Sequence, residues 1–422
     1  MLDLKFIREN PELVKAGIAK KNDKSDIDAI LQLDEKRRDI IREVEQLKGE
    51  RNKASAEIGK KKKAGESADE AVAAMKEVGN KISSYDEKLR EVEEKLNTAL
   101  TWIPNIPHEK APVGSEENNV VLRTWGEVPQ YDFKVLPHWE LGESLGILDL
   151  PAASKISGSG FYVLKGTGAL LQRALINYML DTHIRDGFIE YNVPFLVTTD
   201  TMFGTGQLPK MEEDMYKTAA DEDDLYLIPT AEVPLTNMFK KEILDYQKLP
   251  VNVVAHTPCF RREAGAAGKD TRGMLRVHQF DKVELVKIVR PETSFEEHES
   301  LLAQAEKILQ GLKLPYRIVE LATGDLSFAA ARCYDIELWA PGVGNWLEIS
   351  SVSNFMDFQA RRMNCRYRDE EKKVQFPHTL NGSGVALARL IPAIIENYQN
   401  EDGTVNIPEI LYPYMKGITK IG

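Results

Sequence analysis

The segment CFRREAGAAGKDTRGMLRVHQFDKVE, residues 259–284, contains two strand-like ends joined by a loop that is rich in glycine. Residues 251–263 are enriched in the β-branched and aromatic side chains that favour strands. Alternating residues of the returning end would share one face of a second strand. These residues are Arg276, His278, Phe280, Lys282 and Glu284. The loop, residues 264–273, has no large apolar side chain, so we predict a long β-hairpin.

The predicted strand face carries arginine, phenylalanine and glutamate, which do not make an ordinary core face because unpaired buried charges are costly. A charged ligand would be the simplest partner for these groups. An exposed hairpin whose charged face is solvated explains the segment equally well when it is considered alone. The rest of the chain is needed to choose between these two interpretations.

The composition is that of a large globular protein. The chain has 422 residues, of which 42% are hydrophobic, and this is enough for a sizeable core and two or three domains. A formal net charge of −11 argues against a general polyanion-binding protein. A local basic patch could still bind nucleic acid on such an acidic chain.

The cysteines and the hydropathy pattern indicate a cytoplasmic protein. Cys259, Cys333 and Cys365 are far apart, so neither a disulfide framework nor a structural zinc site is expected. The first residues lack a signal-peptide pattern, and no segment approaches the roughly 18 apolar residues of a membrane span. We therefore expect no membrane partner.

Residues 26–100 contain no proline and are rich in alanine and charged residues, as long helices are. In the second half, apolar residues recur at spacings of four and three, a heptad pattern. They are Met75, Val78, Ile82, Tyr85, Leu89, Val92, Leu96 and Ala99. The first half is weaker: Ile27, Ile30, Ile41, Val44 and Ile58 fit the pattern, whereas Asp34, Arg37, Lys48 and Arg51 interrupt it.

Gly65, Glu66 and Ser67 break this helix in the middle, and Ser67 with Glu70 could form a capping box for a second helix. We therefore predict an antiparallel coiled-coil hairpin whose arms, at about 1.5 Å per residue, are about 50 Å long. Cationic residues gather near its turn: Arg51, Lys53, Lys60, Lys61, Lys62 and Lys63. A solvated helix end accounts for a lone lysine run, but on a projecting arm an RNA backbone is the better explanation.

Two prolines, Pro104 and Pro107, end the helical region, so we place the boundary between an N-terminal domain, residues 1–104, and a second domain, residues 105–422. In the second domain, a helical pattern at residues 166–186 leads to a strand at residues 188–193. That strand ends at Pro194, which suits a sheet edge or a subunit interface.

Three further groups are candidate ligand-binding residues. Thr230 and Glu232 follow an apolar strand. Glu348 and Ser351 lie on another strand and offer oxygen ligands that suit Mg²⁺, although a carboxylate bonded to hydroxyls explains this pair equally well. Arg389 is predicted in the second turn of a helix that follows the glycines of residues 382–384.

Two apparent nucleotide-binding motifs are rejected. Residues 265–270, GAAGKD, have two rather than four residues between the glycines and an aspartate where a P-loop has serine or threonine. Residues 382–384 lack the third glycine of a dinucleotide-binding fingerprint and have no obvious βαβ context.

Three segments remain, in a fixed order: the helix and strand that end at Pro194, residues 260–263 with their returning strand, and residues 382–389. In this order they resemble the three motifs of the class II aminoacyl-tRNA synthetases. With the N-terminal hairpin and residues 230–232, 348–351 and 379–384, nearly the whole chain resembles the bacterial seryl-tRNA synthetase family. The resemblance implies an α+β fold with an antiparallel sheet flanked by helices, and a homodimer whose interface includes the segment that ends at Pro194.

The resemblance also implies ATP-dependent attachment of L-serine to tRNA(Ser) through a seryl-adenylate, and of serine to tRNA(Sec) where that tRNA is present. A class II synthetase for another amino acid and a non-catalytic RNA-binding paralogue are the alternatives. The complete set of Arg261, Glu263, Glu348 and Arg389 argues against a loss of catalysis.

Residue roles follow from the resemblance. The ATP-binding residues would be Arg261, Arg262, Glu263, Arg276, Phe280, Glu348, Ile349, Ser350, Ser351 and Arg389, with Arg261 and Arg389 as the catalytic residues. The serine-binding residues would be Thr230, Ala231, Glu232, Arg261, Glu284, Asn381 and Ser383. Glu348 and Ser351 would hold Mg²⁺ that arrives with ATP. The tRNA-binding residues would be Arg51, Lys53, Lys60, Lys61, Lys62 and Lys63 on the hairpin, and Lys269 and Arg272 in the loop.

Overall fold

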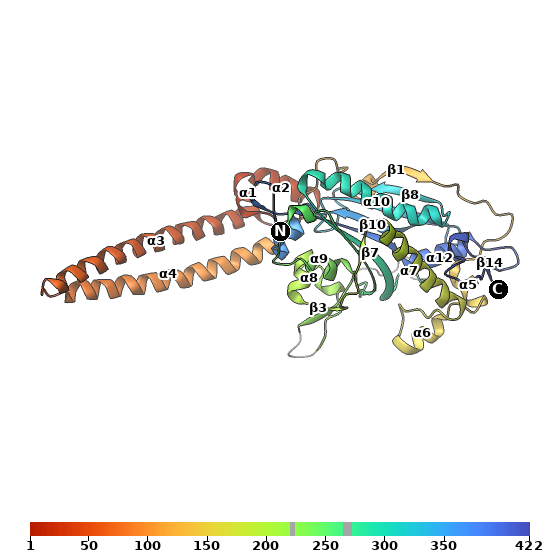
Figure 1. Ribbon diagram of the computed structural model, residues 1–422, viewed down its shortest axis with the longest axis horizontal. Helices are drawn as coiled ribbons and strands as arrows, with labels where there is room; N and C mark the ends of the chain where they lie inside the picture. The colour runs from red at the N-terminus through yellow and green to blue at the C-terminus, as the bar shows by residue number, and fades with distance from the viewer. Residues whose placement is uncertain (220–223, 265–271) are drawn as a thin grey trace. The chain divides into compact units, whose positions relative to one another are not determined.

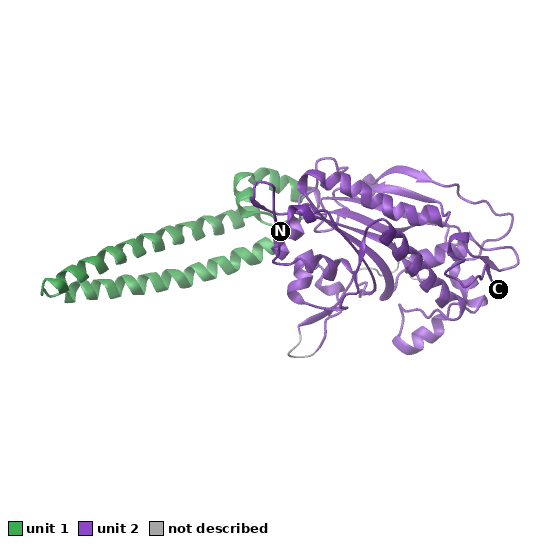
Figure 2. Cartoon of the chain, viewed as in Figure 1, with its two compact units in different colours: residues 1–19, 23–104 green, residues 20–22, 105–422 purple. Residues whose placement is uncertain are grey.

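The computed structural model describes residues 1–219, 224–264 and 272–422. The chain forms two compact units, which Figure 2 shows in different colours. Unit 1 consists of residues 1–19 and 23–104, and unit 2 consists of residues 20–22 and 105–422. Most of the loop at residues 264–273, including Lys269, lies outside the described residues.

The elements that carry the argument below are labelled as in Figure 1. The α-helices are α1 (Leu4–Glu9), α2 (Pro11–Lys20), α3 (Ile27–Lys63), α4 (Asp69–Thr101), α5 (His138–Ser144), α6 (Leu150–Ser157), α7 (Thr167–Arg185), α8 (Thr199–Thr205), α9 (Glu232–Asn237), α10 (Ser294–Gly311), α11 (Phe358–Met363) and α12 (Leu387–Asn397). The strands of the main sheet are β1 (Val120–Trp125), β2 (Ile189–Glu190), β6 (Val251–Phe260), β7 (Gln279–Val289), β8 (Tyr316–Glu320), β9 (Arg332–Ala340), β10 (Asn345–Asn354) and β13 (His378–Ala386). Smaller sheets contain β3 (Leu196–Thr198), β4 (Leu225–Leu227), β5 (Ile243–Asp245), β11 (Arg366–Arg368), β12 (Val374–Gln375), β14 (Val405–Asn406) and β15 (Lys420–Ile421).

Unit 1 is dominated by the antiparallel pair of α3 and α4, which are 37 and 33 residues long (Figure 1). Ile40 and Val44 of α3 pack against Val92 of α4. The predicted heptad residues of α4 are all buried or partly buried, so the predicted coiled-coil pair is confirmed. In α3 the pattern was misread by one residue, because Ile40 is buried and Ile41 only partly so.

Two of the charged residues that interrupt the apolar seam of α3, Asp34 and Arg37, have partners within unit 1. Asp34 is 1% exposed and accepts hydrogen bonds from Arg8 of α1 and from Arg38, each at 3.0 Å. Arg37 reaches across to Glu93 of α4 at 2.9 Å. Burying a carboxylate in this way is tolerated because both guanidinium groups compensate its charge.

The turn between α3 and α4 differs from the prediction. Helix α4 begins after Ala68, which makes no side-chain capping bond, and Ser67 instead donates to the Asp69 carboxylate at 2.9 Å. The predicted capping box of Ser67 and Glu70 is therefore wrong. The acidic side chains of Asp69 and Glu70 stand in the first turn, where negative charge favours the helix dipole.

Unit 2 is built on the eight-stranded sheet, in the order β1-β8-β9-β10-β13-β7-β6-β2. Each neighbouring pair is antiparallel except β6 and β2, which are parallel. A short turn at residues 341–344 joins β9 to β10, and β6 pairs with β7 from Val251 opposite Ile288 to Phe260 opposite Gln279. The α+β fold with an antiparallel core is therefore as predicted.

The helices α7, α10 and α12 cover one face of this sheet. Their residues Leu171, Leu301 and Ile391 share a single apolar core with Leu285 of β7. A side chain at Gly382 of β13 would meet Leu301 of α10 at 3.2 Å, so the glycine permits close packing of α10. Because side chains alternate along a strand, Asn381 and Ser383 face the opposite side of the sheet.

Three predicted element boundaries near the site differ from the structure. Strand β7 begins only at Gln279, so Arg276 and His278 precede it, and Phe280, Lys282 and Glu284 alone alternate within it. Residues 382–384 belong to β13 rather than to a helix-leading loop, and α12 begins at Leu387, which places Arg389 in the first turn. Similarly, β4 ends at Leu227 and Glu232 opens α9.

Within the described residues, no helix combines the length and the apolar character needed to cross a membrane. Cys259, Cys333 and Cys365 are buried and do not form disulfides.

Candidate active site

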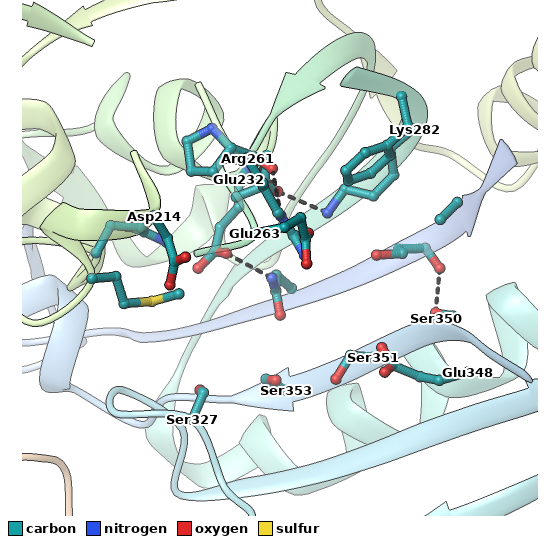
Figure 3. A pocket seen from close by; sticks show the side chains of 18 of the residues that line it. Asp214, Glu232, Arg261, Glu263, Lys282, Ser327, Glu348, Ser350, Ser351 and Ser353 are labelled. Carbon is teal, nitrogen blue, oxygen red and sulfur yellow. Dashed lines mark hydrogen bonds between the residues drawn. The ribbon is translucent and has the colours of Figure 1, made fainter. Parts of the chain in front are cut away.

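A cavity of about 490 Å³ lies on the face of the sheet opposite α7, α10 and α12. Residues of β7, β10 and β13 form its floor, and residues 275–277 and Arg389 of α12 close one end. Figure 3 shows Glu348, Ser351 and Ser353 following one another along β10, across the cavity from Arg261, Glu263 and Glu232. The antiparallel order β10-β13-β7 brings together residues that are far apart in the sequence.

A buried polar pocket occupies the end of the cavity near α9. Glu232 is 5% exposed and accepts hydrogen bonds from Gln359 at 2.7 Å and from Asn381 at 2.8 Å. Burial, and secondarily the charge of Glu284, raises the pKa of Glu232 to about 7. The Oδ1 atom of Asn381 is buried and lacks a hydrogen-bond partner, so the pocket offers an unused acceptor to a ligand that brings a donor.

Glu284 lies beneath this pocket and is fully buried. The Lys282 ammonium, itself 5% exposed, pairs with Glu284 at 2.5 Å and donates to the Thr230 hydroxyl at 2.9 Å. Asn381 donates to Glu284 at 3.2 Å, and Ser383 donates to it at 3.4 Å. Lys282 therefore neutralises Glu284, whereas the hydrogen bonds to the neighbouring Glu232 come from the neutral amides of Gln359 and Asn381.

Arg261 stands between this pocket and the rest of the cavity. Its guanidinium carbon lies 5.3 Å from the centre of the Phe280 ring, and its Nε donates to the Pro229 carbonyl at 3.4 Å. Its backbone N–H donates to the carbonyl of His278 at 2.9 Å. Because that bond extends the β6 and β7 pairing beyond the strands, the backbone of Arg261 is fixed while its cationic end faces the cavity.

A second cationic group, Arg276, lines the same cavity. Arg276 Nη1 donates to Glu263 at 2.8 Å, and the Arg276 Nε atom is buried without a hydrogen-bond partner. Glu263 adopts a left-handed backbone conformation, with φ of 52°. Just beyond it, the Ala264 N–H donates to the Asp214 carboxylate at 2.9 Å. An unpaired buried guanidinium nitrogen is a ready donor for an anionic ligand.

The third cationic group, Arg389, lies against Glu348. The Arg389 guanidinium donates to the Glu348 carbonyl, and its Nη1 lies 3.5 Å from the Glu348 carboxylate. Its Nε donates to the Leu275 carbonyl at 3.3 Å. Arg389 is thereby tied both to β10 and to the segment that leads into β7.

The oxygen groups of β10 suit a divalent cation. Glu348 lines the cavity with its side chain 48% exposed, and the Ser351 hydroxyl donates to Asp335 of β9 at 2.6 Å. Burial, followed by the charge of Glu348, raises the pKa of Asp335 well above its ordinary value. The Glu348 carboxylate and the Ser351 hydroxyl are hard oxygen ligands of the kind that Mg²⁺ prefers, so the residues present fit that ion. In the described ranges, no cluster of three or more His, Cys, Asp or Glu residues has metal-binding geometry.

Most of the predicted small-molecule site residues line this cavity. Lining positions include Arg261, Glu263, Arg276, Phe280, Glu348, Ile349, Ser350, Ser351, Arg389, Thr230, Glu232, Asn381 and Ser383. Arg262 is exposed, and Ala231 and Glu284 are fully buried; none of these three is among the described residues that line the cavity. The Ser350 hydroxyl points to the Ser383 carbonyl at 2.6 Å, as Figure 3 also shows.

Several lining residues were not predicted. Lys282 was assigned to the strand face but not to the site, although its charge next to Thr230 and Glu284 organises the pocket. Gln207, Asp214 and Ser353 also line the cavity. The alternation of Phe280, Lys282 and Glu284 could have indicated Lys282, whereas nothing in the sequence pattern placed residues 207 and 214 beside β10.

The predicted tRNA-binding residues of unit 1 are exposed. Arg51, Lys53 and the four lysines at residues 60–63 lie in the C-terminal half of α3, and the four lysines form its last turn. Arg272 of unit 2 is exposed as well, whereas Lys269 is outside the described residues. The exposed lysines repel one another, so a polyanionic partner would relieve that repulsion.

Comparisons with known proteins agree for both units. Residues 1–107 match the family model "Seryl-tRNA synthetase N-terminal domain", and residues 216–398 match "tRNA synthetase class II core domain (G, H, P, S and T)". A serine–tRNA ligase of Desulfitobacterium hafniense is 53% identical over 424 residues, covering 100% of both chains. One of Caldanaerobacter subterraneus subsp. tengcongensis is 55% identical over 419 residues, covering 99% of this chain and 98% of that one.

A solved structure is similar over the same length. The crystal structure of seryl-tRNA synthetase from Pyrococcus horikoshii complexed with ATP superposes with a TM-score of 0.94 at 43% identity. The match covers 100% of this chain and 99% of that chain.

Proposed function

Because the chain belongs to the seryl-tRNA synthetase family of class II aminoacyl-tRNA synthetases, we propose that it joins L-serine to tRNA(Ser) through a seryl-adenylate made from ATP. The observation that carries the choice of amino acid is the small buried pocket around Asn381. This pocket suits a small ligand with several hydrogen-bond donors. Its polar groups are the unpaired Oδ1 atom of Asn381, the carboxylate of Glu232 and the hydroxyls of Thr230 and Ser383. Serine supplies an ammonium and a hydroxyl in that volume.

Within the pocket, we assign the serine ammonium to Glu232. Lys282 already neutralises Glu284, so a second cation would gain little there. Glu232 has a pKa raised to about 7, mainly by burial, and an arriving ammonium would stabilise its ionised form. Glu284 and Ser383 then act as the polar floor near the serine hydroxyl. Alanine would leave these buried groups unpaired, and so the pocket would reject it strongly.

The two reacting groups meet at Arg261. Its planar fork can hold the serine carboxylate and the α-phosphate of ATP together. Phe280 offers a ring face to adenine, and Glu263 an acceptor to the adenine amino group. Arg276 and Arg389 face the phosphates, where they stabilise the negative charge that moves toward pyrophosphate.

The reaction then has two steps. The serine carboxylate attacks the α-phosphorus, the bond to the β-phosphate oxygen breaks, and pyrophosphate leaves with the electron pair. A terminal ribose hydroxyl of the tRNA next attacks the seryl carbonyl and AMP leaves. Neither step needs a covalent enzyme intermediate, so this chain acts by positioning and by electrostatic stabilisation.

Mg²⁺ is proposed to enter with ATP and to be held by Glu348 and Ser351. When bound there, the ion supplies charge that offsets the phosphate oxygens. Glu348 would hold the ion through its carboxylate, which also lies 3.5 Å from Arg389 Nη1. Asp335 keeps the Ser351 hydroxyl oriented from behind.

The wider context is part of the same proposal. We place the protein in the cytoplasm as a homodimer, with the lysines of α3 and Arg272 contacting tRNA(Ser), and tRNA(Sec) as a second acceptor where the cell has one. The exposed cationic turn of α3 supports the tRNA contact, because phosphate binding by lysine is favoured by counterion release.

Amino-acid-dependent exchange of labelled pyrophosphate into ATP tests the proposal. With serine, alanine, threonine, glycine and proline supplied in turn, we expect serine to exceed alanine in kcat/KM by about a thousandfold or more, since a pocket that binds a hydroxyl rejects its apolar analogue. Faster exchange with another amino acid would show that the protein is specific for that amino acid instead of serine. Exchange with none would support the non-catalytic paralogue.

A matched variant controls for contaminating host enzyme. Arg261→Lys keeps the positive charge but removes the planar fork, so it should abolish most serine-dependent exchange. If Arg261→Lys retained the exchange rate of the wild type, the activity would not belong to this cavity.

A further inference from the structure

Outside the cavity, a buried histidine joins three segments that surround it. His138 is the first residue of α5, and its side chain is 0% exposed. Its Nδ1 atom lies 2.8 Å from the carboxylate of Glu396, which is also 0% exposed and stands near the end of α12. Its Nε2 atom accepts a hydrogen bond from the backbone N–H of Met274 at 3.1 Å.

These contacts fix the protonation state of His138. A backbone N–H can only donate, so Nε2 must be the unprotonated nitrogen of the ring. The proton of the neutral imidazole is therefore on Nδ1 and is donated to Glu396. The Glu396 carboxylate also accepts hydrogen bonds from the backbone N–H groups of His138 and Gly342, each at 2.9 Å. Its position is therefore fixed from several sides.

The backbone is crowded around this contact. A Cβ atom on Gly273 would lie 2.1 Å from His138 Nε2, and φ of Gly273 is +68°. A Cβ atom on Gly342 would lie 2.6 Å from the Leu136 carbonyl and 2.9 Å from the Glu396 carboxyl carbon. Glycine is needed at both positions because any side chain would push His138 or Glu396 out of place.

The contact lies beside the phosphate end of the cavity. Met274 is followed by Leu275, whose carbonyl accepts from Arg389 Nε, and by Arg276, whose Nε is buried and unpaired. Arg389 and Glu396 are seven residues apart on α12, so they lie on the same side of the helix, about 10 Å apart along its axis. Helix α12 therefore holds residues 274–276 at two points, directly through Arg389 and indirectly through Glu396 and His138.

We propose that His138 is a positioning residue for adenylate formation. The neutral His138 side chain, anchored by Glu396, fixes the backbone of residues 274–276 where the chain returns to the cavity, and we call this His138–Glu396 pair the strut. It thereby places Arg276 and Arg389 for the phosphates of ATP. The proposal rests on the function proposed above. It concerns the ATP side only. The side-chain hydrogen bonds of the serine-pocket residues Thr230, Glu232, Asn381 and Ser383 join them to one another and to Gln359, Lys282 and Glu284.

Two substitutions at one position separate positioning from packing. In His138→Asn, the amide nitrogen takes the place of Nδ1 and keeps the hydrogen bond to Glu396. The backbone N–H of Met274 then has no side-chain acceptor at residue 138. In His138→Gln, the longer side chain can place its amide oxygen where Nε2 was and so accept from Met274. Both variants remove the ring and lose similar packing, so both should melt at a lower temperature than the wild type.

The measurement is serine-dependent pyrophosphate exchange, with KM for ATP and KM for serine determined separately. We expect His138→Asn to raise KM for ATP by about tenfold, the usual effect of one lost buried hydrogen bond, while KM for serine changes by less than about twofold. His138→Gln should recover part of the ATP affinity, because its amide oxygen can accept from the Met274 N–H although the bond to the Glu396 carboxylate is lost. Equal effects of the two variants on ATP, or equal effects on ATP and serine, would show that His138 only fills space.

A measurement on the unaltered protein covers the case in which neither variant folds. ¹⁵N spectra of histidine-labelled wild type should show one ring with its proton on Nδ1 and with Nε2 unprotonated. A ring carrying its proton on Nε2 at this site would overturn the proposal. If the wild type binds ATP but shows no exchange with serine, the proposed function fails, and ATP affinity of the two variants still tests the strut.

Discussion

At the scale of single residues, the chemistry depends on the different environments of two neighbouring glutamates, Glu284 and Glu232. Glu284 is paired with the buried Lys282, whereas Glu232 has a carboxyl whose pKa burial raises to about 7. One site thus contains a neutralised carboxylate and a carboxyl that takes up its charge near neutral pH. In the proposed function, this division would let the pocket bind a hydroxyl and an ammonium with side chains of the same type.

The pH dependence of serine binding follows from Glu232. Below pH 7 the carboxyl is protonated in the free protein, so binding the serine ammonium must first release that proton. We expect KM for serine to fall as the pH rises from 5.5 to 7 and to level off above it, while KM for ATP serves as the internal reference. A serine KM that does not change between pH 5.5 and 7 would contradict the assigned role.

The same group affects stability with a definite sign. The folded protein holds the Glu232 proton to about pH 7, whereas the unfolded chain releases it near the ordinary value of 4.5. Stability from this group is therefore complete below pH 4.5 and is lost between pH 4.5 and 7, at roughly 1.4 kcal/mol per pH unit. Glu232→Gln lacks the titration, so the melting temperature of the wild type relative to this variant should decline from pH 5 to pH 8.

At the scale of elements, α3 and α4 form a long pair whose stability comes from a narrow apolar seam and a few ion pairs. The last turn of α3 carries four lysines that are not needed for that seam. Their repulsion is a cost to the free protein, which indicates that they are kept for a partner. We propose that this partner is the phosphate backbone of tRNA.

The lysine turn is tested by a double substitution, Lys61→Ala with Lys62→Ala. Each lysine that contacts a phosphate contributes about 0.9 to the slope of log affinity against log salt, so the slope for tRNA should fall by about two. Serine-dependent pyrophosphate exchange should be unchanged, because adenylate formation needs no tRNA.

The matched control removes two exposed cations at the other end of the same helix pair, Lys36→Ala with Lys95→Ala. If this control lowered the salt slope as much as the lysine-turn variant does, the effect would reflect general charge rather than a contact at residues 61 and 62. A loss of exchange in the lysine-turn variant would instead indicate a folding defect.

At the scale of the whole molecule, the sheet of unit 2 ends in the short strand β2, and apolar side chains near that edge are exposed. Ile189 is 59% exposed, Leu196 43%, Phe195 40% and Tyr191 37%. Apolar side chains gathered in this way mark interaction surfaces in soluble proteins. The predicted homodimer interface includes this segment, so a second copy of the chain would cover it.

We therefore expect the protein to sediment at twice its chain mass of 47.6 kDa, and Ile189→Lys to shift it toward the monomer by placing a charge in the apolar interface. Val374→Lys is the control, because Val374 is also exposed, at 44%, but lies on β12 of a different sheet. A dimer that survives Ile189→Lys at micromolar concentration would place the interface elsewhere.

The heptad residues of α4 and the strand of residues 251–260 could be predicted because periodic spacing fixes which side chains share a face. The order of the three motifs likewise pointed to the antiparallel core. Errors arose at element ends: Arg389 lies in the first helical turn, Arg276 precedes β7, and Ser67 does not cap α4. Ends depend on individual hydrogen bonds that a pattern of residue types does not specify.

The sequence by itself determined the helical hairpin, the class of the core and the residue types of the cavity, because these follow from local periodicity and from motifs whose residues are close along the chain. Only the tertiary structure decided that Lys282 neutralises Glu284, that Glu232 retains a raised pKa, and that His138 links Met274 to Glu396. His138 and Glu396 are 258 residues apart. Such contacts are set by strand order, register and the burial of charge, which exist only once the distant segments have packed together.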